Sequence, residues 1–310
     1  MNWFYRERRV AAGIFVVCTL LGGCKGGAKA ALKAPRPQPT GLSTSSISPP
    51  RSKATATTTT STTRPLTASP FAGASSYLAG RSGQVTAAVY DARTGQTWTL
   101  NPRDGPQDTA SIVKVEIMGA ALEDAQTANE ALTPAQVSLM RSMIENSDNA
   151  SATTLLNDVG GPSALARFDR LVGMTDTTPS TLAYIPGTTL PGWGLTTTTA
   201  NDEVVLVSKF AFSNNILSDT SRAFGLSLME NVEAGQNWGV SGGVSPDDVI
   251  ALKNGWLPLS VSDWQANSIG WISGSGRNYV LAVLTTGDPT EAYGIDTIQG
   301  VSRMVFAGLA

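Results

Sequence analysis

Histidine is absent from this chain of 310 residues, and only 15% of its residues are charged. Without an imidazole, the protein cannot build a serine–histidine–aspartate or cysteine–histidine catalytic group, nor a histidine-rich zinc site. A serine that attacks a carbonyl carbon must then use a lysine or a carboxylate as its base. No feature of the sequence requires a metal ion or an organic cofactor, so neither is expected.

Cysteine is nearly as scarce, because the chain has only Cys18 and Cys24, and both lie near its start. The remaining chain can form no disulfide, no thiol nucleophile and no cysteine-based metal site. The formal net charge is only −2, so the protein has no basic field of the kind that attracts nucleic acids. Nucleic acid is therefore not expected as a partner.

Residues 1–23 have the pattern of a secretory signal peptide. Arginines are followed by an apolar run over residues 10–21 and then by small residues, which is the order that export signals share. The run is shorter than the roughly 20 apolar residues of a membrane-spanning helix. Leu21-Gly22-Gly23-Cys24 resembles the bacterial lipobox, so Cys24 is expected to carry a lipid anchor at the outer face of the cell membrane. A plain signal peptide with an incidental cysteine is the alternative.

Residues 24–70 are rich in alanine, proline, serine and threonine and hold few large apolar side chains. Such a segment cannot bury enough apolar surface to offset the entropy lost on ordering, which predicts a disordered tether. One globular domain is then expected over residues 71–310.

The pattern from residue 71 onward predicts two strands, a block of helices, three strands and a final helix. Strands are expected over residues 85–90, 97–100, 249–256, 264–272 and 279–286. Helices are expected over residues 111–128, 150–158, 163–172, 202–212, 219–233 and 290–309, and another opens at Thr133-Pro134-Ala135-Gln136. This segregated order predicts an α+β fold, with an antiparallel five-stranded sheet, flanking terminal helices and an inserted all-helical lobe. A cleft between sheet and lobe is the expected place for a site.

The first motif that carries chemistry is Ser111-Ile112-Val113-Lys114, at the start of an expected helix. Residues three apart on a helix share a face, with Cβ atoms about 5–6 Å apart, so the hydroxyl and the amine can meet. A lysine serves as a base only when its ammonium form is destabilised, for example by burial or by a second cation. Taken alone, the motif is a weak signal, and a solvated helix face explains it better.

Two further motifs follow along the chain. Ser147-Asp148-Asn149 lies between two expected helices, where the same residue types also serve as helix caps and turns. Lys253-Asn254-Gly255 ends an apolar strand, and Asn-Gly is also a common hairpin turn. Each motif therefore has a purely structural alternative when it is considered by itself.

In this order and in these contexts, the three motifs resemble the set shared by serine β-lactamases and penicillin-binding proteins. The resemblance to class A β-lactamases extends over residues 75–310. Beyond the motifs, it rests on Gly160-Gly161-Pro162 before a helix, residues 185–187 and 196–199 in an omega-loop region, and residues 266–270 and 281–286 in the last two strands. It implies a serine hydrolase of the β-lactamase or penicillin-binding type.

The resemblance implies catalytic roles for three residues. Ser111 would be acylated, Lys114 would take its proton, and Ser147 would pass a proton to the leaving nitrogen. Asn149 would hold the substrate amide. Asp148 would be structural, because it would anchor the loop that carries its two neighbours.

The third motif would bind substrate from its strand. Lys253 would provide positive charge toward a substrate carboxylate and would help to lower the pKa of the first lysine. Asn254, where the family usually has threonine or serine, and Gly255 would contribute to the same surface. The backbone N–H groups of Trp256 and Ser111 would form the oxyanion hole.

The sequence also departs from the family. Class A β-lactamases carry an omega-loop glutamate that activates the deacylating water, but no glutamate occurs here between Glu145 and Glu203. The corresponding residues 181–184 are uncharged, and Asp176 is the nearby acid. The segment between the first two motifs is shorter, and the fourth strand has no arginine for a substrate carboxylate. We therefore expect acyl-enzymes with β-lactams to persist.

Three functions remain open at this point. The first is an acyl-enzyme-forming hydrolase with a cell-envelope substrate, either a peptidoglycan-type peptide or a β-lactam. The second is an efficient β-lactamase with a substitute base. The third is a lipoprotein that keeps the fold, has lost catalysis, and binds an envelope polymer or a partner protein.

Overall fold

The computed structural model describes residues 68–260 and 262–310. The predicted signal peptide, Cys24 and the tether up to residue 67 lie outside these residues, so those predictions stay predictions. In the part of the chain that the structure describes, no helix combines the length and the apolar character needed to cross a bilayer.

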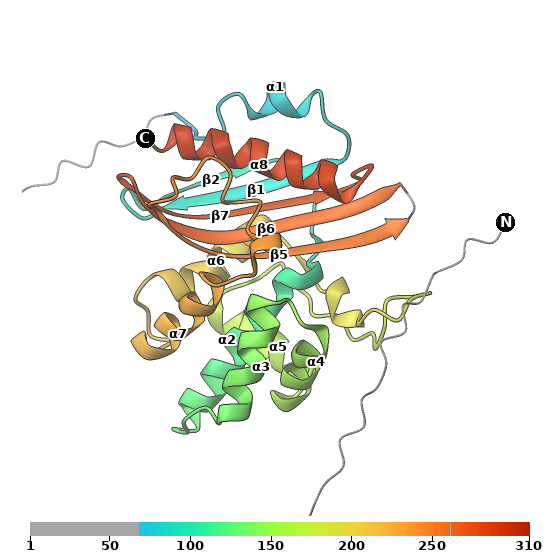
Figure 1. Ribbon diagram of the computed structural model, residues 1–310, viewed down its shortest axis with the longest axis vertical. Helices are drawn as coiled ribbons and strands as arrows, with labels where there is room; N and C mark the ends of the chain where they lie inside the picture. The colour runs from blue at the N-terminus through green and yellow to red at the C-terminus, as the bar shows by residue number, and fades with distance from the viewer. Residues whose placement is uncertain (1–67, 261) are drawn as a thin grey trace, which may run out of the picture. The chain divides into compact units, whose positions relative to one another are not determined.

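Five strands form one antiparallel sheet in the order β2-β1-β7-β6-β5. Their bounds are β1 Gln84–Asp91, β2 Gln96–Leu100, β5 Val249–Ser260, β6 Asp263–Gly274 and β7 Arg277–Thr286. The predicted antiparallel five-stranded sheet is thus confirmed. Strand β5 lies at an edge of the sheet, next to the helical lobe (Figure 1).

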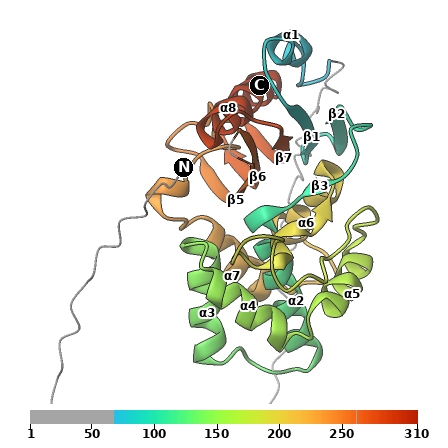
Figure 2. The same ribbon diagram turned by 90° about the vertical axis from the view of Figure 1, so that its right-hand side faces the viewer.

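Helices cover both faces of the sheet. The C-terminal helix α8 (Glu291–Gly308) and the short helix α1 (Ala74–Leu78) lie on one face, and the helical lobe lies on the other (Figures 1 and 2). The lobe consists of α2 Val113–Thr127, α3 Pro134–Glu145, α4 Asn149–Asp158, α5 Pro162–Val172, α6 Ala200–Ala211 and α7 Asp219–Met229. Since these helices all lie between β2 and β5 in the chain, the predicted insertion is confirmed.

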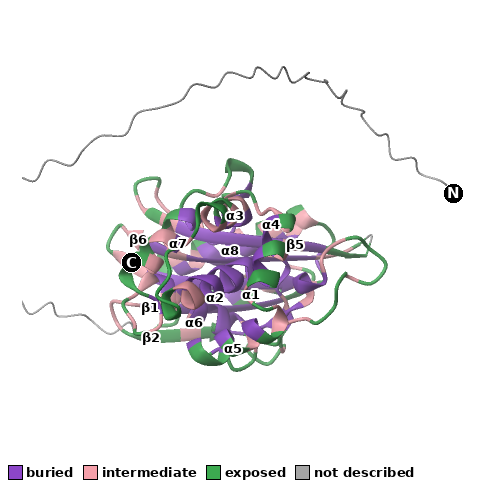
Figure 3. Cartoon of the chain, turned by 90° about the horizontal axis from the view of Figure 1, so that it is seen from below, coloured by how far each residue is buried: buried purple, intermediate pink, exposed green. Residues whose placement is uncertain are grey.

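Side chains that alternate along the strands face two separate apolar cores, one on each side of the sheet. In the central strand β7, Leu281 and Val283 pack toward α8, whereas Ala282 and Leu284 pack toward the lobe. This is the two-residue period of a strand that is covered on both faces. Figure 3 shows buried residues along the sheet and along the helices that lie against it. The sheet therefore forms a rigid base for the edge strand.

Local capping fixes where two helices begin. The Thr133 hydroxyl accepts the Gln136 N–H at 3.2 Å, and the Gln136 side chain accepts the Thr133 N–H at 2.9 Å, which is a complete capping box. Asp148 caps α4 by accepting the Ser151 N–H at 2.7 Å. The second cap holds the turn between α3 and α4 in place, and that turn carries the second motif.

Three of the differences from the sequence prediction concern helices. Ser111 lies in a short 3₁₀ turn, η1 (Ala110–Ile112), and α2 begins after it. Helix α7 ends at Met229 rather than at residue 233. The five-residue helix α1 was not expected, because so short a helix carries little periodic signal.

Three buried carboxyl groups of the lobe have raised pKa values, and they lie on three different helices: Glu116 on α2, Asp169 on α5 and Glu203 on α6. Burial raises the pKa of Asp169 to about 7 and that of Glu203 to about 8. The pKa of Glu116 is raised well above its usual value, first by burial and then by the charges of the other two groups. These carboxyls are therefore protonated over much of the range in which ordinary acids are ionised.

Candidate active site

Three elements bring the sequence motifs together beside the edge strand. Ser111 lies in the turn before α2, the second motif lies between α3 and α4, and Lys253 lies on β5. The turn before Ser111 is fastened to the sheet, because the Asn267 side chain on β6 donates to the carbonyls of Asp108 at 2.8 Å and Thr109 at 3.0 Å. Sequence reasoning did not assign this fastening role to Asn267.

The amine of Lys114 lies at the centre of the site. Its Nζ is 2.9 Å from Ser111 Oγ and 2.9 Å from Ser147 Oγ. It also contacts the Ser147 carbonyl at 2.5 Å and Asn149 Oδ1 at 2.8 Å. These four oxygens are all uncharged, so hydrogen bonds hold the amine while no direct carboxylate contact fixes it as an ammonium ion.

Burial makes Lys114 a plausible base near neutral pH. Desolvation lowers the pKa of the buried amine to about 7, and the nearby charge of Asp148 opposes this shift only in part. An amine with that pKa is substantially uncharged at pH 7, as a general base must be.

Lys253 extends the same hydrogen-bond chain. Its Nζ lies 3.0 Å from Ser147 Oγ and 3.0 Å from the Asn254 carbonyl, and its side chain is fully buried. Burial, followed by the charge of Lys114, lowers the pKa of Lys253 well below its ordinary value, while Glu233 opposes the change. The Ser147 hydroxyl therefore lies between two amines, where it can pass a proton in either direction.

Two non-glycine residues adopt left-handed backbone conformations at the site. Ala110, immediately before the candidate nucleophile, has φ 49°, and Ser147 has φ 57°. Such conformations cost free energy and persist where surrounding contacts impose them. The hydroxyls of Ser147 and of Ser111, which follows Ala110, both contact the Lys114 amine. The strained backbone therefore lies at the positions that orient these two hydroxyls.

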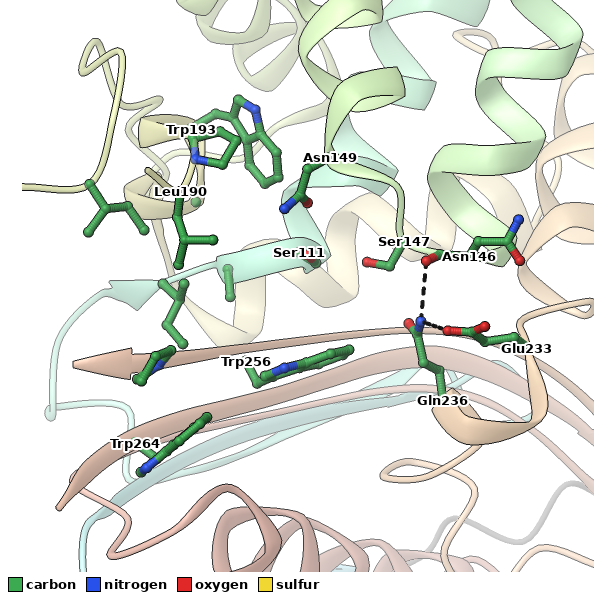
Figure 4. Close-up of a pocket in the computed structure, with 16 residues that line it drawn as sticks. Ser111, Asn146, Ser147, Asn149, Leu190, Trp193, Glu233, Gln236, Trp256 and Trp264 are labelled. Carbon is green, nitrogen blue, oxygen red and sulfur yellow. Dashed lines mark hydrogen bonds between the residues drawn. The ribbon is translucent and has the colours of Figure 1, made fainter. Parts of the chain in front are cut away.

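Gly255 allows the edge strand to approach the nucleophile turn. A Cβ at this position would lie 2.6 Å from the Ser111 backbone nitrogen and 2.8 Å from the Thr109 carbonyl oxygen. Any larger residue would push β5 away from Ser111. The structure therefore gives Gly255 a packing role next to the expected oxyanion hole, while the side chain of Trp256 lines the cleft (Figure 4).

Asn254 is placed differently from its predicted substrate-binding role. Its side chain is buried and donates to the carbonyls of Gln236 at 2.7 Å and Trp238 at 3.1 Å. The amide thus fastens the segment after α7 to β5, and it does not line the cleft. The sequence shows that asparagine stands where the family usually has threonine or serine. The direction of its side chain, however, depends on a segment that is distant in the chain.

The cleft that contains Ser111 has a volume of about 500 Å³. Sequence reasoning identified its polar centre but missed most of its wall, which comes from loops without a motif. The missed residues that line it are Ala110, Asn146, Ile185, Leu190, Pro191, Trp193, Gly194, Glu233, Gln236, Leu257, Pro258 and Trp264. Figure 4 shows Asn149, Ser147 and Trp256 around Ser111.

The omega-loop region contributes an indole beside Lys114. The ring of Trp193 is centred 5.1 Å from the Lys114 amine, and its Nε1 donates to the Thr153 hydroxyl at 3.0 Å. Asp176 lies elsewhere, where its N–H donates to the Asp202 carboxylate at 2.8 Å, and it does not line this cleft. Among the described residues, no group of histidine, cysteine and acidic side chains is arranged to hold a metal ion.

Comparison with known proteins agrees with this fold. The family model described as "Beta-lactamase enzyme family" matches residues 134–309. The protein is similar to "Putative lipoprotein LppW" of Mycobacterium tuberculosis strain H37Rv, with 24% identity over 87% of this chain and 83% of that protein. A class A β-lactamase from Bacteroides cellulosilyticus superposes with a TM-score of 0.68 at 18% identity, over 77% of this chain and 96% of that one. An ancestral class A β-lactamase superposes with a TM-score of 0.66 at 21% identity, over 77% of this chain and 99% of that one.

The fold is thus that of the class A β-lactamases, as the motif resemblance predicted. The chain belongs to the beta-lactamase enzyme family.

Proposed function

We propose that the protein is a serine hydrolase that forms an acyl-enzyme on Ser111 with a carbonyl substrate of the cell envelope. The observation that carries the proposal is the continuous chain of hydrogen bonds from Ser111 through Lys114 and Ser147 to Lys253. A nucleophile, a base with lowered pKa and a hydroxyl relay are what acyl transfer without histidine requires.

Each step follows from these contacts. The uncharged Lys114 amine takes the Ser111 proton, and Ser111 Oγ attacks the substrate carbonyl carbon. The N–H groups of Ser111 and Trp256 would stabilise the resulting oxyanion. The bond to the leaving group then breaks, and Ser147 relays a proton from Lys114 to that group. Asn149 accepts from Lys114 through Oδ1, which leaves its N–H₂ group to donate to the substrate.

Deacylation is expected to be the slower half of the reaction with β-lactams. Hydrolysis of the acyl-enzyme needs a base that activates a water molecule. Trp193 lies beside Lys114, and the omega-loop region supplies no cleft-lining carboxylate. Substrates such as a peptidoglycan-type peptide or a β-lactam would therefore acylate Ser111 faster than they leave it.

An envelope location is part of the proposal. The lipobox-like sequence before Cys24 supports export and lipid anchoring, and the mycobacterial relative carries the name "Putative lipoprotein LppW". The missing omega-loop acid also supports a second candidate, a catalytically degenerate lipoprotein that binds an envelope polymer or a partner protein.

Labelling with a fluorophosphonate separates the two candidates, because this probe reacts covalently with an activated serine. Wild type and the exposed-serine control Ser163→Ala should gain one phosphonyl group on the peptide that contains Ser111. Ser111→Ala should remain at background. Mass spectrometry of the intact protein and of its peptides provides the readout. Equal background in all three proteins would reject the hydrolase and favour the binding protein.

A further inference from the structure

The cleft around Ser111 is polar at one end and apolar at the other. Asn146, Ser147, Glu233 and Gln236 lie at one end, whereas Leu190, Trp256 and Trp264 lie toward the other (Figure 4). Ile185, Pro191, Leu257 and Pro258 also line the cleft and add to its apolar surface. One part of a substrate bound at Ser111 would therefore contact apolar side chains.

Two protruding elements build the apolar end, the 182–192 loop and the β5–β6 hairpin (Figure 1). The loop is closed by hydrogen bonds from Ile185 N–H to the Leu190 carbonyl at 2.9 Å and from Gly192 N–H to the Ala183 carbonyl at 3.0 Å. In the hairpin, Trp264 exchanges two backbone hydrogen bonds with Asp288, at 2.8 and 2.9 Å. These bonds hold both walls in place before a substrate arrives.

The loop and the hairpin that contribute to the apolar end also carry exposed apolar residues. Leu182 and Tyr184 on the loop are 49% and 63% exposed, and Leu259 on the hairpin is 42% exposed. Each lies within three residues of a residue that lines the cleft.

The cleft offers no positive charge to a carboxylate. Among the sixteen described residues that line it, Glu233 alone carries a charge. Lys253 is fully buried and bonded to Ser147, and the Asn254 amide is bonded to two backbone carbonyls. A substrate carboxylate would lose its hydration without gaining a cationic partner among the lining residues, which is costly.

We propose that the hydrolase site takes uncharged esters or amides whose acyl group is apolar, in preference to carboxylate-bearing β-lactams or peptides. The proposal rests on the proposed function. In the reaction, Ser111 Oγ bonds to the acyl carbon while the bond to the leaving alcohol or amine breaks. The leaving group receives the proton that came from Ser111. Water then cleaves the acyl-enzyme, which releases a carboxylic acid and restores the Ser111 hydroxyl.

Two esters of equal chain length test the proposal, 4-nitrophenyl pentanoate and mono-4-nitrophenyl glutarate, which differ by a terminal methyl group or carboxylate. Ser111-dependent kcat/KM should be at least about tenfold higher for the pentanoate. From the acetate to the pentanoate ester, it should rise by about two- to fourfold for each added methylene group.

Variants of Leu190, which lines the apolar end of the cleft, test whether the cleft causes the preference for the pentanoate ester. Leu190→Ala should lower kcat/KM for the pentanoate by about threefold or more, while the matched control Leu171→Ala, exposed on α5 away from the cleft, should not change it. Leu190→Arg should shift the preference toward the glutarate, because it places a cation at the wall. Circular dichroism spectra check that the variants are folded.

The outcomes separate the two proposals. If fluorophosphonate labels Ser111 but the glutarate ester reacts as fast as the pentanoate, or neither ester releases 4-nitrophenol in a Ser111-dependent way, the substrate class is wrong and the hydrolase stands. If the probe does not label Ser111 and neither ester reacts in a Ser111-dependent way, both proposals fall.

Discussion

Replacing Lys114 by methionine is expected to slow the phosphonylation of Ser111 by about 10²- to 10⁴-fold, the usual contribution of a general base. The Lys114 amine is the group within hydrogen-bond distance of Ser111 Oγ that can take its proton. Methionine is of similar length and suits a buried position, so the variant removes the base with little loss of packing. The measurement is the second-order rate constant for reaction with the fluorophosphonate.

A control separates the loss of this amine from the loss of any lysine. Lys209→Met removes a partly buried lysine on α6, outside the cleft, and should react at the wild-type rate. Near-ultraviolet circular dichroism of each variant reports whether tertiary packing is intact. A well-folded Lys114→Met protein that reacts as fast as wild type would show that Ser111 is activated by some other group.

The buried carboxyls of the lobe predict an unusual dependence of stability on pH. An acid whose pKa is raised in the folded state binds more protons folded than unfolded. Its contribution to stability is complete below its unfolded pKa and is lost as pH rises through its folded pKa. For Asp169 and Glu203 the loss should run from about pH 4 to about pH 7 and 8 respectively. The contribution of these two carboxyls should therefore be smaller at pH 8 than at pH 5, whereas the lowered pKa values of the buried Lys114 and Lys253 act in the opposite sense.

The surroundings of these groups support that sign. The charge of Asp202 raises the pKa of both Asp169 and Glu203. The charges of Asp169 and Glu203 in turn raise the pKa of Glu116. The charge of Arg170 acts on Asp169 in the opposite direction, but burial outweighs it. Ionising the cluster at high pH would place unpaired negative charge inside a helical core, which is strongly unfavourable.

Glu203→Gln keeps the shape of the side chain and removes its ionisation. We expect this variant to raise the melting temperature at pH 8 by about 5 °C or more and to change it little at pH 5. The exposed control Glu130→Gln should leave the melting temperature unchanged at both pH values. If Glu203→Gln changes stability equally at pH 5 and pH 8, the buried glutamate does not ionise in this range.

The sequence predicted those parts of the fold that depend on local patterns. Apolar runs bounded by turn residues identified the strands, and Thr133 with Gln136 identified the start of α3 through a capping box that the structure contains. The spacing of Ser111 and Lys114 predicted a hydroxyl and an amine within reach of each other, and the structure places them 2.9 Å apart. The antiparallel sheet and the inserted lobe followed from the order of the elements.

Features set by contacts between distant segments could not be predicted in the same way. Trp193 approaches Lys114 because the omega-loop region folds over α2, and no local motif marks it. The Asn254 amide turns toward residues 236–238, which depends on how the segment after α7 meets β5. For the same reason the apolar wall at Leu190 and Trp264 emerged only once the loop and the hairpin were placed together.

The central claim is that an uncharged Lys114 amine activates Ser111, and the pH dependence of the fluorophosphonate reaction tests it most directly. Burial sets the pKa of this amine at about 7. The rate constant should rise about tenfold per pH unit below pH 7 and level off above it, since the base is active only when deprotonated. A rate that is constant between pH 5 and 9, or that keeps rising toward pH 10 as with an ordinary lysine, would contradict the account.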